Sequence, residues 1–204
     1  MTSFAWLPLD QDLPGHRHFY IGRMNTLDLD LWQDENLIRR QNQLKYQFWE
    51  LLGEIGDLFP QEDLVQVHSN SKGKKLSQGQ DLGGLPYQVL DLIRDFDFET
   101  GLNIRLLNWF GKGLFLFVLA GKSSYPKLQL SPANFQLCQS ESAWDYQEIL
   151  LGIPNEKQAE NRDFNQWFKE LKVESAIERN KNEWQKEIRA VFEHLKAHSA
   201  KSQI

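Results

Sequence analysis

Apolar and polar residues alternate most regularly in residues 102–110, as they do in a β-strand. Leucine, isoleucine and phenylalanine side chains predominate on one side of this segment. The other side carries Asn103, Arg105, Leu107 and Trp109. Gly111 and Gly113 then interrupt the alternation and permit a tight turn. Because residues 114–120 follow as LFLFVLA, the pattern predicts an antiparallel hairpin, 102–110 with 114–120, at the centre of a sheet.

The second strand of this hairpin is apolar on both sides, so neither side suits contact with water. Three arrangements satisfy that requirement. Helices cover both faces of the sheet, the sheet curls around an apolar interior, or a second subunit covers one face. The sequence leaves these alternatives open, and the third is a reason to expect a homo-oligomer such as a homodimer.

Two longer segments repeat their apolar residues at helical spacing. In residues 33–59 leucine recurs at every seventh position, which predicts an amphipathic helix that ends before Pro60. Residues 156–198 carry two further apolar stripes and predict one long bent helix or two helices that meet near Val173. The stripes consist of Phe164, Trp167, Phe168 and Leu171, and of Ile177, Trp184, Ile188, Val191, Phe192 and Leu195.

The other predicted elements are short. Residues 86–90 predict a strand beside the hairpin, and residues 69–84, which are polar and rich in glycine, predict a hairpin connection or a mobile surface loop. Residues 91–100 are either a helical turn or an extended crossover. Further candidate strands are residues 18–24, 64–68, 135–139 and 146–151. The whole pattern predicts an α+β fold, an antiparallel sheet covered by helices, in a single domain over residues 1–204.

The composition is that of a soluble globular protein, with 41% hydrophobic and 25% charged residues. A formal net charge of −5 gives no general attraction to nucleic acid or anionic lipid, so we expect neither a nucleic-acid partner nor a membrane. The single cysteine, Cys138, excludes an intramolecular disulfide, and we expect a buried, unreactive thiol. The sequence shows no signal-peptide pattern and no apolar segment of the about 20 residues that a membrane span needs. These observations favour a cytoplasmic protein.

Metal and cofactor sites find little support in the sequence. His16 and His18 would share one face of a strand, but zinc typically takes three or four protein ligands. The acidic residues between positions 91 and 99 lack the positioned lysine of a magnesium-dependent nuclease. We therefore expect no cofactor and no metal.

Lys74 and Lys75 are candidate ligand-binding residues, because lysines among glycines bind anions through ammonium and backbone N–H groups. Their spacing differs from the phosphate-binding pattern G-x-x-x-x-G-K-[ST]. A solvated hairpin tip is the simpler explanation.

Tyr87, Arg105 and Trp109 form the other candidate site. Arg105 and Trp109 lie on one face of the predicted strand, and Tyr87 on the neighbouring strand joins them. A cation, an indole and a phenol suit a small ligand through stacking and hydrogen bonds. Asp91 lies nearby in sequence and is a candidate acid or base. An aromatic core with one arginine at its edge explains the same residues.

Two segments within residues 84–121, GLPYQVLD and IRLLNWFGKGLFLFVLAG, resemble an uncharacterised family of small bacterial conserved hypothetical proteins. In that family a G-x-x-Y-P-Y-x-x-L-D-like strand precedes an aromatic and glycine-containing hairpin. The chain departs from the pattern in having Leu85 before Pro86. The resemblance implies a bacterial protein and no particular activity, and it adds Pro86 and Gly111 to the positions of interest.

These observations favour a non-catalytic protein that acts by binding a partner, a second copy or a small molecule. The alternative is an enzyme that acts on a small anionic substrate, with its site on the face of Tyr87, Arg105 and Trp109. The sequence identifies no catalytic residue. Nucleic-acid binding through the lysines near position 74 is disfavoured by the acidic net charge.

Overall fold

The computed structural model describes residues 26–126, 128–130, 133–151 and 162–201. The chain divides into two compact units, residues 1–33 and residues 34–204. The described part of the first unit holds the short helix α1 (Leu29–Gln33), and the other described elements belong to the second unit. A single domain over the whole chain stays a prediction. The candidate strand 18–24 and the two histidines at positions 16 and 18 lie outside the described residues.

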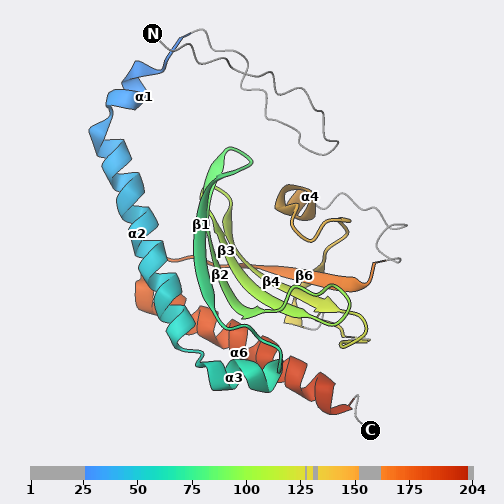
Figure 1. The fold of residues 1–204 in the computed structure, drawn as a ribbon. Coiled ribbons are helices and arrows are strands. Elements are labelled where there is room, and N and C mark those ends of the chain that lie inside the picture. Colours follow the sequence, from blue (N-terminus) through green and yellow to red (C-terminus); the bar gives the residue numbers. More distant parts are fainter. Residues whose placement is uncertain (1–25, 127, 131–132, 152–161, 202–204) are drawn as a thin grey trace, which may run out of the picture. The chain divides into compact units, whose positions relative to one another are not determined.

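The second unit is built on a six-stranded sheet whose pairings are all antiparallel. The strands are β1 (Lys75–Leu82), β2 (Leu85–Arg94), β3 (Leu102–Trp109), β4 (Gly113–Gly121), β5 (Gln136–Leu137) and β6 (Phe164–Leu171), in the spatial order β1-β2-β3-β4-β6-β5. Strands β3 and β4 are the predicted hairpin, and they lie in the middle of the sheet (Figure 1). The positive φ of Gly111 and Gly113 supplies its turn. The predicted α+β fold is thus confirmed.

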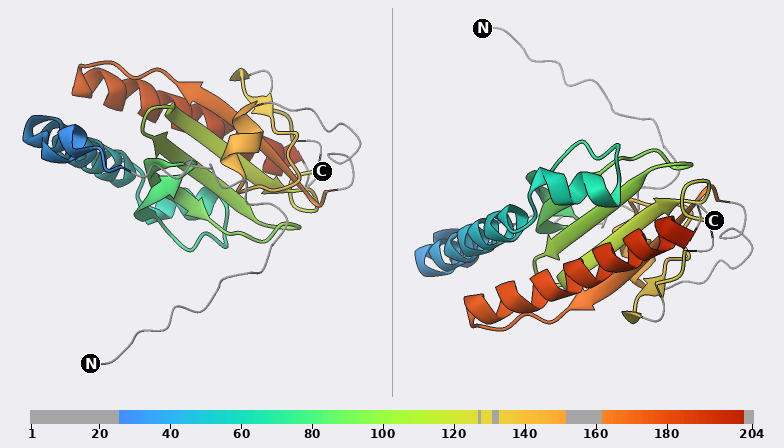
Figure 2. Two further views of the ribbon diagram at one scale, coloured as in Figure 1. Left: turned by 90° about the horizontal axis from the view of Figure 1, so that it is seen from above. Right: turned by 90° about the horizontal axis from the view of Figure 1, so that it is seen from below.

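Three helices cover one face of the sheet: α2 (Glu35–Asp57), α3 (Gln61–Val67) and α6 (Ile177–Lys201) (Figure 2). They bury the larger apolar core, to which β3 and β4 contribute their even-numbered leucines. The Asp34 side chain caps α2 by accepting a hydrogen bond from the backbone N–H of Leu37. No described helix has the length and apolarity that crossing a membrane requires.

Helix α2 agrees with the predicted segment 33–59, but only its second half is buried. Leu51, Leu52 and Ile55 belong to the core, whereas Leu37 and Leu44 of the same stripe are exposed. A polar contact marks the end of the packed region, because the Gln88 side chain donates a hydrogen bond to the backbone oxygen of Lys45. The heptad pattern therefore predicted the helix correctly without showing how far the sheet extends beneath it.

The opposite face of the sheet is covered by α4 (Tyr146–Leu151) and the chain that leads into it (Figure 1). This face has its own apolar cluster, in which Leu107, Phe115 and Phe117 pack against Cys138 and Ile149. Cys138 is a free, buried thiol, as predicted. Both faces of β4 are therefore covered by the chain itself, so its apolar pattern requires no second subunit.

Three predicted elements are wrong. Residues 64–68 belong to helix α3 up to Val67, and residues 146–151 form helix α4; both segments were expected to be strands. Residues 164–171, expected to be helical, form strand β6. Here Phe164 and Phe168 lie on one face of the sheet, and Trp167 and Leu171 on the other, so burial on both faces mimics a helical stripe.

The polar segment 69–84, expected to be a hairpin connection or a mobile surface loop, contains a strand, because residues 75–82 form the edge strand β1. An edge strand with one partner can be polar and contain glycine. Strand β2 continues to Arg94, so the undecided segment 91–100 begins as strand and then turns. Of the candidate strand 135–139, Gln136 and Leu137 form β5.

Candidate functional site

The register of β2 and β3 brings the predicted site residues to one face of the sheet. Asp91 lies opposite Arg105, and Tyr87 lies opposite Trp109. A β-bulge follows Asp91 immediately, because the register shifts by one residue between Asp91 and Ile93. The bulge lets Leu92 and Ile93 both enter the core on the helix-covered face while Asp91 stays on the other face.

Arg105 and Asp91 form a buried, bidentate ion pair at the centre of this face. The Arg105 Nε and Nη2 atoms lie 2.7 Å and 3.0 Å from the two Asp91 carboxylate oxygens. Asn103 donates a further hydrogen bond to Asp91, and Arg105 Nη1 donates one to the Tyr146 hydroxyl. The side chains of Arg105 and Asp91 are only 14% and 5% exposed. Burial alone would lower the pKa of Arg105, but Asp91 and Tyr146 raise this pKa overall, so the guanidinium stays charged.

An open pocket of about 430 Å³ lies over this ion pair. Its lining is mainly aromatic and aliphatic. The lining residues are Leu82, Tyr87, Val89, Phe96, Arg105, Trp144 and Tyr146. The Arg105 guanidinium carbon lies 4.9 Å from the centre of the Trp144 ring and 5.8 Å from that of Phe96, within cation–π range. Phe96 and Trp144 meet edge to face and remain 39% and 38% exposed, so two large aromatic rings border the pocket with much of their surface in solvent.

Local hydrogen bonds hold Trp144 and Tyr146 over the sheet. The Asp145 side chain accepts a hydrogen bond from the Glu148 backbone N–H at the start of α4. The buried Gln166 side chain on β6 donates to the backbone oxygen of Ala143, just before Trp144. These bonds fix the pocket wall on both sides of Trp144, although Trp144 itself lies in a loop.

The structure brings only some of the predicted site residues into the pocket. Tyr87 and Arg105 line it, and Asp91 supports it from beneath through Arg105. Trp109 is 3% exposed and its indole donates to the backbone oxygen of Leu82, so it is a core residue beside the pocket. Lys74 belongs elsewhere, because its ammonium donates to the backbone oxygen of Gly56 near the end of α2. Lys75 is exposed on β1, opposite Asp91 but outside the pocket lining.

Phe96, Trp144 and Tyr146 are pocket residues that the sequence analysis missed. Phe96 comes from the turn between β2 and β3, whereas Trp144 and Tyr146 come from the segment around the start of α4, which is distant from β3 in the sequence. Asp145 and Glu148 have the spacing of a helix N-terminal cap, D-x-x-E. That signal could have identified α4, but not its position over Arg105.

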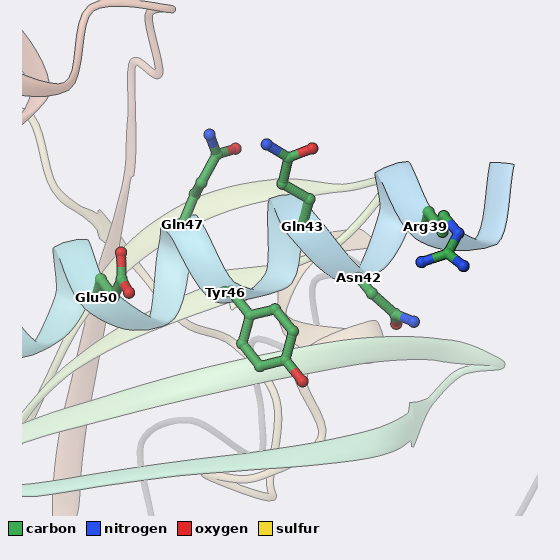
Figure 3. Close-up of a pocket in the computed structure, with 6 residues that line it drawn as sticks. All are labelled: Arg39, Asn42, Gln43, Tyr46, Gln47 and Glu50. Atoms are coloured by element: carbon green, nitrogen blue, oxygen red, sulfur yellow. The ribbon is translucent and has the colours of Figure 1, made fainter. Parts of the chain in front are cut away.

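A second hollow, of about 440 Å³, is lined by residues of α2 alone. Figure 3 shows Gln43 and Gln47 projecting from one side of the helix and Tyr46 from the other. Because these side chains diverge, they do not form a set of groups that surrounds a ligand. We do not regard this hollow as a site.

A buried polar cluster joins the ends of α3 and β2 to the chain after β4. The two ring nitrogens of His68 lie 2.8 Å from an Asp95 carboxylate oxygen and 3.0 Å from the Tyr125 hydroxyl. The order of phenol, imidazole and carboxylate is that of a proton relay. However, all three residues are buried, and burial together with the charge of Asp95 raises the pKa of Tyr125 to about 12. The phenol is a poor nucleophile in this state, and we interpret the cluster as structural.

The pocket offers stacking surfaces and hydrogen-bond donors but no evident reactive group. Its lining contains no histidine, cysteine, serine or carboxylate among the described residues. Burial raises the pKa of the Tyr146 phenol against the opposing effect of Arg105, so the phenol stays protonated. The described residues contain no cluster of three or more potential metal ligands. The arrangement is chemically suited to holding a flat molecule.

Comparisons with protein-family models, with curated proteins and with solved structures find no match. The resemblance of residues 84–121 to a bacterial family therefore stays a prediction.

Proposed function

We propose that the protein is a non-catalytic binding protein that holds a small molecule in the pocket around Arg105. The observation that carries this proposal is the pair of exposed rings, Phe96 and Trp144, that borders a pocket with a buried guanidinium at its base. Neighbouring large aromatic rings that are exposed to solvent often mark a ligand-binding or interaction site. Small-molecule sites typically combine such apolar walls with a few fixed polar groups.

The same residues support binding over catalysis. Asp91 was the candidate acid or base, but its carboxylate holds Arg105 and Asn103 and is almost inaccessible. A general base must lie within hydrogen-bond reach of the proton that it removes from a substrate. Asp91 does not line the pocket, so we do not propose that the protein is an enzyme acting on a small anionic substrate.

Fluorescence titration with Nile red, an uncharged flat dye, tests the proposed function. The dye should bind the native protein, and Trp144→Ala should weaken binding about fivefold, because an aromatic contact contributes about 1 kcal/mol. Tyr46→Ala is the control, since it removes an exposed aromatic side chain (70% exposed, against 38% for Trp144) from α2, which covers the opposite face of the sheet (Figure 2). Equal affinities of the native and Trp144→Ala proteins would overturn the proposal.

We further propose that the protein acts in the cytoplasm of a bacterium. The free thiol of Cys138 fits a reducing compartment, and the bacterial origin rests on the resemblance of residues 84–121. We retain a homodimer as part of the proposal, supported by the exposed apolar residues Leu37, Ile38 and Leu44 of α2. Analytical ultracentrifugation tests the dimer, and a monomer at high protein concentration would exclude it.

A further inference from the structure

The polar groups of the pocket restrict the kind of ligand that it can hold. A guanidinium has five N–H groups, and the three hydrogen bonds of Arg105 to Asp91 and Tyr146 use three of them. One N–H on each terminal nitrogen has no hydrogen-bond partner within the described part of the chain. The base of the pocket therefore supplies donors, and a ligand must bring an acceptor.

The charge of Arg105 is already balanced within the protein. Both oxygens of Asp91 bond it at 2.7 Å and 3.0 Å, and the Asp91 carboxylate is fixed because it is almost fully buried. An anionic ligand would bring a second negative charge close to this carboxylate in a partly buried site, where like charges repel more strongly than in water. The nearest further cation in the same cross-strand row, Lys75, is exposed and lies outside the pocket lining.

The side walls of the pocket favour a flat ligand. Trp144 and Phe96 flank the Arg105 guanidinium, and Tyr87 and Val89 line the side formed by β2. Flat rings stack on such surfaces, whereas a puckered ring makes fewer contacts with them. Tyr87 is itself fixed by packing across Gly79, where a Cβ atom would lie 2.4 Å from its ring.

We propose that this pocket selects an uncharged, planar ring that carries a carbonyl or ring-nitrogen acceptor for Arg105. This inference rests on the proposed function and specifies its ligand class. It also differs from the alternative of a small anionic substrate, because Asp91 neutralises the charge of Arg105.

Three probes of similar size separate these requirements. Benzamide is planar, uncharged and carries an acceptor; benzoate replaces the amide with a charge; cyclohexanecarboxamide keeps the acceptor and loses the flat ring. Each is titrated into the full-length protein while the indole N–H signal of Trp144 is followed by nuclear magnetic resonance, with the signal assigned from Trp144→Phe. Benzamide should bind about tenfold more tightly than either of the other probes.

The outcomes distinguish this inference from the proposed function. Benzoate binding as tightly as benzamide would overturn the ligand class and leave small-molecule binding in place. Saturable binding of cyclohexanecarboxamide at the benzamide affinity would overturn the requirement for a planar ring. No response to any probe, together with no Nile red binding at the pocket, would overturn the proposed function itself. Because the affinities are compared on the native protein, a variant is needed only to assign the Trp144 signal.

Discussion

Removing one partner of the Asp91–Arg105 pair should destabilise the protein far more than removing both. The two side chains are 5% and 14% exposed, so either single change leaves a buried charge without its partner. We expect Asp91→Leu and Arg105→Met each to lower the free energy of unfolding by about 3 kcal/mol. The double variant replaces the pair with apolar side chains of similar size and should lose about 1 kcal/mol or less.

Urea unfolding followed by circular dichroism measures these differences. With a slope of about 2 kcal/mol per molar urea, each single change should lower the midpoint by about 1.5 M and the double variant by about 0.5 M or less. The double-mutant cycle should therefore show a coupling energy of several kcal/mol. If the losses of the two single variants sum to the loss of the double variant within about 0.5 kcal/mol, Asp91 and Arg105 are not coupled. The interpretation of these residues as a buried ion pair at the base of the pocket would then be wrong.

Three further predictions concern the pocket wall and the buried titratable groups. Gly79→Ala should weaken Nile red binding several-fold because its Cβ displaces the Tyr87 ring, whereas Gly53→Ala, where a Cβ meets nothing within 4 Å, should leave binding unchanged; the reverse order would contradict the packing. Cys138, whose pKa burial raises to about 12, should resist Ellman's reagent at pH 8 until urea unfolds the chain, and rapid labelling of the native protein would contradict its burial. Burial and, to a smaller extent, Asp95 raise the pKa of Tyr125 from 10.0 to about 12, so the folded state holds this proton more tightly than the unfolded chain does; the resulting stability is complete below pH 10 and is lost as the pH rises through about 12. Between pH 9 and pH 12 the free energy of unfolding, measured with urea, should therefore fall less for Tyr125→Phe than for the native protein. Equal falls in the two proteins would show that Tyr125 titrates normally.

The central hairpin and α2 could be predicted because each has a single dominant period. Residues 102–110 alternate cleanly since β3 packs different residues on its two faces, and the register with β2 follows once both strands are recognised. Tyr87 and Arg105 were therefore correctly placed on a common face. Trp109 was placed on that face too, and its burial agrees with the alternative that it is a core residue.

The errors have identifiable physical causes. The apolar residues of β6 face both sides of the sheet, so their spacing of three and four residues fits a helix as well as a doubly buried strand. The starts of α3 and α4 carried local signals that outweigh short apolar runs: Pro60 followed by Glu62 and Asp63, and the Asp145–Glu148 spacing.

Phe96, Trp144 and Tyr146 could not be assigned to the pocket from the sequence. Phe96 and Trp144 approach Arg105 only because the turn after β2 and the chain before α4 meet over the sheet. Residues 95–99 alternate acidic and aromatic side chains, but nothing local in the sequence links this turn to the chain before α4. Such long-range proximity depends on how the chain crosses the sheet, which periodicity alone does not determine.

The most direct test of the central claim is a crystal structure of the full-length protein soaked with 4-bromobenzamide, in which anomalous scattering locates the bromine. We expect a bromine peak in the pocket, with the ring between Phe96 and Tyr87 and the amide oxygen accepting a hydrogen bond from Arg105. A peak confined to the hollow on α2, or no bound ring in the pocket at saturating concentration, would contradict the account.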